Sequence, residues 1–184
     1  DKHIRSIEKR IFSISNEAEF EEVAFEIFQL QYKNCIPYRD YVNFLGVDTK
    51  KIEKCFQIPF FPIEFFKNHK IKHKDYNEAT VFYSSGTTGV NQSKHFVVDE
   101  NLYKRSFINA FEIFYGNIRD YCFLALLPGY LEREGSSLIY MVNELMKISK
   151  HPNNGFYLNE YEDLKKNIQF LKQKGEKYMV FGVT

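Results

Sequence analysis

The sequence predicts an α/β protein, in which a helical N-terminal segment precedes a layered, largely parallel sheet flanked by helices. Two patterns predict this class. Apolar residues recur at helical spacing before residue 78, and strand-like runs alternate with helical segments after it. The expected division is therefore residues 1–78, helical and packed on the core, and residues 79–184, α/β. Because the chain ends on a strand-like run, we expect the domain to continue beyond Thr184.

Composition excludes several classes of protein. The 184 residues carry a formal charge of +1, so no bulk attraction to nucleic acid or to an anionic membrane is expected. No run approaches the ~20 apolar residues that span a bilayer. The three cysteines, Cys35, Cys55 and Cys122, lack disulfide-framework or zinc-ligand spacing. They predict reduced thiols in a cytoplasmic protein.

Helix signals fill the first segment. Asn16 and Glu19 have capping-box spacing and precede an apolar stripe of helical period. Pro37 opens a second helix, which is expected to stop at Gly46. Asp48 is expected to cap a third helix. The aromatic segment that follows contains two prolines and is expected to be a packed connector rather than a regular helix.

Strands and helices alternate in the second segment. The strand-like runs are 79–83, 95–98, 121–127, 156–158 and 178–183. Three helices are expected among them. The first is capped by Asp99 and has Phe114 on its apolar face, the second starts at serines 136–137, and the third follows a capping box of Asn159 and Glu162.

The loop between the first two strand-like runs carries the most information. It contains four hydroxyl-bearing residues and two glycines in succession, and Lys94 follows. Glycines let successive backbone N–H groups converge on an anion, and a lysine suits phosphate. A polyphosphate-binding loop is therefore predicted, with an ordinary hairpin turn as the alternative. The predicted phosphate-binding residues are Ser84, Ser85, Gly86, Thr87, Thr88 and Gly89.

These residues carry a resemblance to a known superfamily. Ser85-Gly86-Thr87-Thr88-Gly89 with Lys94 resembles the phosphate-binding signature of the adenylate-forming (AMP-binding) superfamily, which includes acyl-CoA synthetases and luciferases. The longer spacing to Lys94, and Ser93 where proline is usual, indicate a particular branch. Within the superfamily, the chain is similar to the acyl-protein synthetase family of the bacterial luminescence fatty-acid reductase system. Three further segments resemble that family: 58–67, 93–95 and 126–138.

The resemblance implies a fold and an activity. The chain, from about Phe20 to Thr184, would be the N-terminal portion of a longer ligase and inactive alone. That ligase would use ATP and Mg²⁺ to adenylate a long-chain fatty acid, and would transfer the acyl group to a protein thiol. A fatty acyl reductase is the implied acceptor. Lys94 and His95 would be catalytic, and residues 84–89 would hold the pyrophosphate portion of the nucleotide.

Other readings remain open. Tyr130, Arg133 and Ser136 follow a buried strand and are expected to contact substrate or nucleotide, although a polar loop with a serine cap explains them equally well. An aryl- or acyl-CoA ligase of the phenylacetate-CoA ligase type and a non-catalytic nucleotide-binding module are the alternative functions. No metal-ligating residues are predicted. Four histidines are expected at the surface: His3, His69, His73 and His151.

Overall fold

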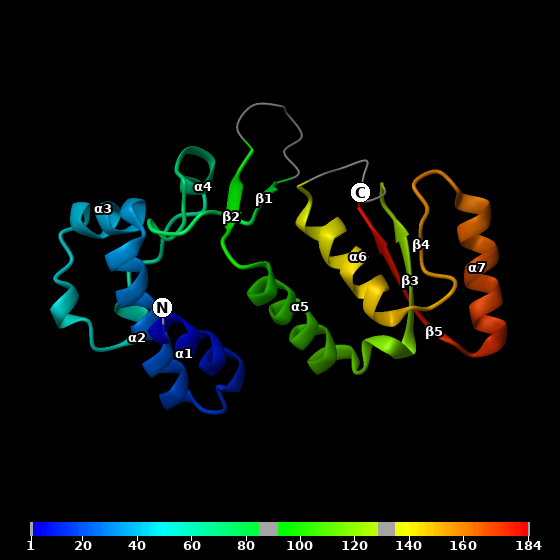
Figure 1. Cartoon of the computed structure of the whole chain (residues 1–184), viewed down its shortest axis with the longest axis horizontal. Helices are drawn as coiled ribbons and strands as arrows, with labels where there is room; N and C mark the ends of the chain where they lie inside the picture. Colours follow the sequence, from blue (N-terminus) through cyan, green and yellow to red (C-terminus); the bar gives the residue numbers. More distant parts are fainter. Residues whose placement is uncertain (1, 85–91, 129–134, 184) are drawn as a thin grey trace. The chain divides into compact units, whose positions relative to one another are not determined.

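The computed structural model describes residues 2–84, 92–128 and 135–183, and these belong to two compact units, residues 1–102 and 103–184 (Figure 1). The first unit contains the N-terminal helices and a pair of strands. The second contains a parallel sheet with helices on both faces. The change from helices to strands expected near residue 78 thus lies inside the first unit, and the division between the units falls within α5 (Glu100–Tyr115).

Two helices of the first unit have a start or a stop that the sequence predicted. The side-chain oxygen of Asn16 accepts the backbone N–H of Glu19 at 3.0 Å, which starts the longest of them. Gly46 adopts a φ of +66° two residues past the end of the next helix. The helices are α1 (Lys2–Arg10), α2 (Glu17–Asn34), α3 (Ile36–Phe44) and α4 (Phe65–Asn68), with short 3-10 helices at Ile11–Ser13, Thr49–Lys51 and Cys55–Gln57.

The third helix expected after Asp48 does not form. Asp48 does cap the chain, and its side chain accepts the N–H of Lys50 at 3.1 Å, but only the short 3-10 helix Thr49–Lys51 follows. A second 3-10 helix, Cys55–Gln57, comes after a break. The side-chain oxygen of Gln57 accepts the backbone N–H groups of Glu53 and Lys54, both at 2.8 Å. These bonds hold an extended break between the two 3-10 helices, so no continuous helix runs through the segment.

The aromatic connector packs on the core of the first unit, as predicted. That core is built from α2 and α3, and includes Tyr38 and Val42. The hydroxyl of Tyr38 donates to the carbonyl of Pro59 at 2.8 Å. The ring of Phe61 lies 5.8 Å from that of Tyr38 and 5.3 Å from that of Tyr41. These contacts fix the chain that leads to the strands.

The first two strands form an antiparallel hairpin. β1 (Thr80–Tyr83) pairs with β2 (Lys94–Val97) in a register that sets Phe82 opposite His95 and Tyr83 opposite Lys94. Among the described residues this pair is a sheet of its own, separate from the parallel sheet of the second unit. The expectation that these strands belong to one largely parallel sheet is therefore wrong for the described chain.

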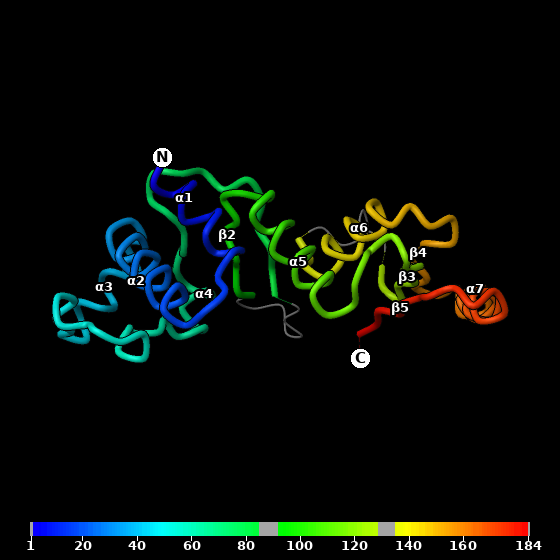
Figure 2. Tube along the Cα trace, turned by 90° about the horizontal axis from the view of Figure 1, so that it is seen from below, coloured from blue at the N-terminus to red at the C-terminus, as the bar shows by residue number. Residues whose placement is uncertain are grey.

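The parallel sheet has the strand order β4-β3-β5. β3 (Tyr121–Leu126) is central, and β4 (Gly155–Phe156) and β5 (Lys177–Gly182) flank it. Side chains of α6 (Ser137–Ser149) share a cluster with Ala125, whereas those of α7 (Tyr161–Lys174) share another with Cys122 and Leu124. Both views show the strands between the two helices (Figures 1 and 2). The fold class is mixed α/β, as predicted.

Two helix details differ from the expectation. Phe114 of α5 is 79% exposed, and Phe111 instead enters the core beside Phe123. The capping box expected ahead of α7 is absent. Glu160 is the residue before the helix, and its side chain does not cap it. The Glu160 carboxylate instead accepts the backbone N–H of Asn159. Apolar residues surround the end of α5, so the choice of buried face depends on contacts with β3 that the local pattern does not contain.

Candidate functional site

The neck of the predicted phosphate loop lies at Ser84 and Ser93. The backbone N–H of Ser84 donates to the carbonyl of Ser93 at 3.0 Å, and the N–H of Ser93 donates to the hydroxyl oxygen of Ser84 at 3.0 Å. The Ser84 amide is thus used within the hairpin, while its hydroxyl, an acceptor here, retains a proton to donate. The other predicted phosphate-binding residues lie outside the described part of the chain: Ser85, Gly86, Thr87, Thr88 and Gly89.

Lys94 and His95 leave the loop on opposite faces of the hairpin. Successive residues of a strand point to opposite faces, and residues directly opposite each other across an antiparallel pair share a face. His95 therefore shares a face with Phe82, and Lys94 shares the other with Tyr83. Phe82 is buried, whereas Tyr83 is 43% exposed. The two residues expected to be catalytic therefore point to opposite faces of the hairpin, although both are exposed.

His95 lies on the inner face against α4. Its ring makes an edge-to-face contact with Phe66, with centroids 6.2 Å apart and an interplanar angle of 81°. Partial desolvation by the surrounding protein lowers the pKa of His95 below its ordinary value of 6.5, although the residue is exposed to solvent. The imidazole is therefore neutral at pH 7, and it suits packing or proton acceptance rather than charge neutralisation.

Lys94 is exposed on the outer face, directly across from Tyr83. Phe96 lies on this same face, and the ammonium of Lys70 sits 5.1 Å from the centre of its ring. Lys70 also forms an ion pair with Glu78, whereas Lys94 forms none with any residue that the structure describes. Within residues 2–84, 92–128 and 135–183, therefore, no carboxylate is paired with the Lys94 ammonium.

The lysine-rich segment before β1 is held to the fold by ion pairs with Glu78. Glu78 accepts ion pairs from Lys70 at 2.6 Å and from Lys72 at 3.3 Å, and the side chain of Lys72 is only 12% exposed. The hydrogen bond from Lys70 lowers the pKa of Glu78 to about 2, with smaller contributions from a backbone N–H and from Lys72. The N–H of Lys74 donates to the carbonyl of Asn34 at 2.8 Å. These contacts tie the start of β1 to the end of α2.

The segment between β3 and α6 is described only at its ends. Tyr130 and Arg133 lie outside the described residues. Ser136 is the N-cap of α6, with its hydroxyl accepting the N–H of Ile139 at 3.4 Å, as the alternative interpretation predicted. Because α6 and α7 cover opposite faces, the carboxyl ends of β3 and β5 form a topological switch point of the kind at which α/β sheets bind ligands.

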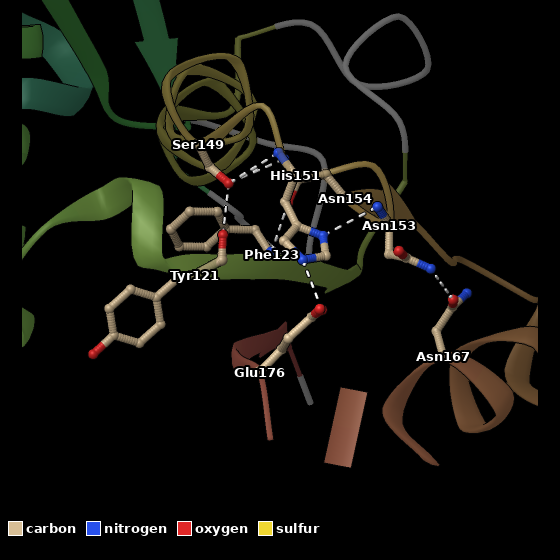
Figure 3. Close-up of polar contacts among 8 residues, drawn as sticks. All are labelled: Tyr121, Phe123, Ser149, His151, Asn153, Asn154, Asn167 and Glu176. Carbon is tan, nitrogen blue, oxygen red and sulfur yellow. Dashed lines mark hydrogen bonds and ion pairs between the residues drawn. The ribbon is translucent and has the colours of Figure 1, made fainter. Parts of the chain in front are cut away.

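A polar network at the opposite end of this sheet was not foreseen from the sequence (Figure 3). Asn154 accepts the N–H of Phe123 through its side-chain oxygen at 2.8 Å and donates to the carbonyl of Met146 at 3.1 Å. The hydroxyl of Ser149 donates to the carbonyl of Tyr121 at 2.6 Å. The signal was a run of asparagines immediately before a strand, where amide side chains can replace missing backbone partners. The network joins the ends of elements and is structural.

The same network corrects the expectation that His151 is a surface residue. Its side chain is 16% exposed and contacts Glu176 through Nε2 at 3.1 Å (Figure 3). The N–H of Asn153 donates to Nδ1 at 3.1 Å, so Nδ1 is the acceptor and Nε2 carries the proton. Both ring nitrogens are thus engaged within the protein. His151 has no nitrogen left for catalysis.

No three or more His, Cys, Asp or Glu side chains among the described residues are grouped as a metal site. No described helix is both long and apolar enough to cross a membrane. Comparisons with protein-family models, with curated proteins and with solved structures found no match for this chain.

Proposed function

We propose that this chain is the N-terminal part of an adenylate-forming enzyme that activates a fatty-acid carboxylate with ATP. The observation that carries the proposal is the environment of Lys94. This lysine follows a run of glycines and hydroxyl residues, begins β2 on its exposed face, and forms no ion pair with a described residue. A free ammonium beside such a loop is what a polyphosphate requires, because phosphate charge must be neutralised for a second anion to approach.

In the proposed reaction a carboxylate oxygen attacks the α-phosphorus of ATP. A bond forms between that oxygen and the phosphorus, the bond to the β-phosphate oxygen breaks, and pyrophosphate leaves. Residues 84–89 would hold the β- and γ-phosphates by N–H and O–H donors, and Lys94 would offset their charge. The hydroxyl proton of Ser84 is available for this role, whereas its amide is already bonded to Ser93.

Mg²⁺ fits this proposal as a companion of the phosphates rather than as a resident of a protein cage. Mg²⁺ usually keeps several waters and binds through one or two carboxylates and the phosphate oxygens of the substrate. The described residues contain no cluster of three or more potential ligands, so they offer no such cage. When bound with ATP, the ion would withdraw charge from the phosphates, and Lys94 would supply a second cation at the same mouth.

In this proposal the acyl acceptor is neither Cys35 nor Cys122, because both thiols are buried. Burial raises the pKa of Cys122 to about 11, and Cys35 is 1% exposed. A transferable acyl group needs an accessible thiolate. A thiol on a partner protein, as the acyl-protein synthetase reading implies, or the thiol of CoA would meet that need. A requirement for CoA in acyl transfer would favour the CoA-ligase alternative.

Calorimetric titration of the chain with Mg·ATP tests the proposal. We expect wild-type binding, and at least about tenfold weaker binding by Lys94→Ala, a loss typical of one charge-assisted contact. Lys172→Ala is the matched control, because Lys172 is exposed on α7 in the other unit and should leave affinity unchanged. Absence of wild-type binding at millimolar Mg·ATP would overturn the proposal, and so would equal affinities of wild type and Lys94→Ala.

A further inference from the structure

We propose that the Asn154-Gly155 pair is a covalent modification site whose reaction is blocked by folding. The reaction is deamidation of Asn154 through a cyclic imide. It is held back while the sheet of the second unit is closed, and it proceeds when this end of the sheet opens. Because the reaction is irreversible, an opening becomes a permanent loss of stability. The site lies in the second unit, and its chemistry needs no nucleotide.

The reaction requires only these two residues and water. The backbone nitrogen of Gly155 attacks the side-chain carbonyl carbon of Asn154. A bond forms between these two atoms, the bond from that carbon to Nδ2 breaks, and ammonia leaves with the proton of the Gly155 N–H. Water then opens the imide at either carbonyl and leaves aspartate or isoaspartate. Glycine favours the attack because it has no Cβ to shield its nitrogen, and this is the only Asn-Gly sequence in the chain.

Hydrogen bonds at both ends of the amide fix the side chain of Asn154 (Figure 3). Its Oδ1 accepts the N–H of Phe123 at 2.8 Å, and its Nδ2 donates to the carbonyl of Met146 at 3.1 Å. The hydroxyl oxygen of Ser149 lies 3.4 Å from the same nitrogen. Ring closure must bring the side-chain carbon onto the backbone nitrogen of the next residue and expel Nδ2. The closed sheet therefore opposes the reaction.

Gly155 is fixed by its strand pairing and packs closely against an aromatic ring. It pairs with Leu124 in the parallel ladder of β4 and β3. A Cβ at its position would lie 3.0 Å from the ring and the hydroxyl of Tyr157. That ring is itself held, because the Tyr157 hydroxyl accepts a side-chain N–H of Asn167 at 2.9 Å. The fold thus favours at this position the neighbour that leaves an asparagine most reactive.

The acidic products cannot replace Asn154. An ionised aspartate has only acceptors, so it can accept the N–H of Phe123 but has no hydrogen for the carbonyl of Met146. Two oxygens would then face each other in place of a 3.1 Å hydrogen bond. Isoaspartate adds a methylene group to the backbone immediately before β4 and so disturbs its register with β3. Either product weakens this end of the sheet.

Deamidation rates of the whole chain at pH 8, in native buffer and in concentrated urea, test the protection. Proteolysis and mass spectrometry follow the peptide that contains Asn154, with the other asparagines as internal references. In urea we expect Asn154 to react faster than any of these, and Gly155→Ala to slow it several-fold. In native buffer Asn154 should react at least about tenfold more slowly than in urea, because only the open fraction reacts.

Two further variants test whether the closed sheet is the cause of the protection. The hydroxyl of Ser149 donates to the carbonyl of Tyr121 and lies beside the amide of Asn154. Ser149→Ala should therefore raise the native rate several-fold. Lys172→Ala, at an exposed position on α7, is the control and should leave the native rate unchanged.

Asn154→Asp reproduces one product and tests the consequence. We expect it to lower the midpoint of urea unfolding and to accelerate amide hydrogen exchange at Phe123. Asn159→Asp adds the same charge at an exposed position of the same unit and should leave both unchanged. Failure of Asn154→Asp to fold would agree with the proposal, and the rates measured on wild type do not depend on it.

The remaining outcomes overturn the proposal. Equal rates in native buffer and in urea would refute the protection. A faster native reaction would also refute it, because the Phe123 N–H would then be stabilising the developing oxyanion. A rate in urea no higher than that of the other asparagines would remove the site. Wild-type stability of Asn154→Asp would show that an opening leaves no lasting loss.

Discussion

The side chain of Asn154 completes the hydrogen bonding of the central strand at Phe123. Its Oδ1 accepts the Phe123 N–H at 2.8 Å, at a position on β3 just before the first residue that pairs with β4 (Figure 3). Its amide nitrogen donates to the carbonyl of Met146. One side chain thus joins a strand, a helix end and a loop.

Asn154→Ala should destabilise the protein by about 1–3 kcal/mol, because it leaves a buried backbone N–H without a partner. Urea denaturation followed by circular dichroism measures the change. Asn153→Ala is the control, since the side chain of Asn153 bonds only to that of Asn167 among the described residues, and should cost less than about 1 kcal/mol. Equal losses in the two variants would contradict the role assigned to Asn154.

Glu78 should make the first unit sensitive to acid. Its folded-state pKa of about 2 lies below the ordinary value of 4.5, so the carboxylate stabilises the fold above pH 4.5 and that contribution is lost as the pH falls toward 2. Glu78→Gln should therefore lose less stability than wild type between these pH values. Melting temperatures at several pH values provide the measurement. Glu53→Gln, at an exposed carboxylate without a described ion pair, should follow wild type.

The three thiols should react in a fixed order with a disulfide reagent at pH 8. Cys122 is fully buried with a pKa of about 11, and Cys35 is also buried, whereas Cys55 is only partly covered. We expect one thiol per chain to react in the native protein and all three after unfolding. Cys55→Ser should remove the native-state reaction. Native-state reaction of Cys122 would show that its strand opens readily.

Lys150 and Gly175 end their helices in the same left-handed conformation with different residues. Lys150, after α6, has a φ of +55°, and Gly175, after α7, has a φ of +68°. A non-glycine residue in this left-handed region destabilises the folded state by roughly 1–2 kcal/mol. Glycine avoids this strain, but its greater conformational freedom in the unfolded chain offsets part of the gain. Lys150→Gly should therefore raise the free energy of unfolding by up to about 1 kcal/mol, and Gly175→Ala should lower it by about 1 kcal/mol. Chemical denaturation of both variants tests the sign.

Features with a local cause could be predicted from the sequence. Such features depend on residues within one turn or one strand. They include the cap at Asn16, the stop at Gly46, both hairpin strands and the buried strand that begins at Tyr121. The antiparallel pairing of β1 with β2 is the usual arrangement for strands joined by a short connection. The loop chemistry was read from residue types alone and stays a prediction.

Features with a distant cause could not be predicted. Phe111 rather than Phe114 is buried because β3 supplies Phe123 as its partner. His151 lies in a polar run that looks solvated, and only the fold brings Glu176 to its ring. Lys94 and His95 lie on opposite faces because they are successive residues of one strand. Which of them shares a face with the buried Phe82 depends on the pairing with β1.

The strand order of the sheet has a consequence for the route by which the second unit folds. Of the three strands, β3 is synthesised first, yet its longest pairing is with β5. The pair between Tyr121 and Lys177 therefore cannot form until β5 has been synthesised. Pairings between such distant segments form slowly, because a long loop must close first. On the ribosome, the helices of the first unit can assemble early, while β3 stays without its main partner until β5 emerges. During synthesis this topology therefore leaves an apolar strand unpaired, and the strand must be shielded from aggregation until β5 pairs with it.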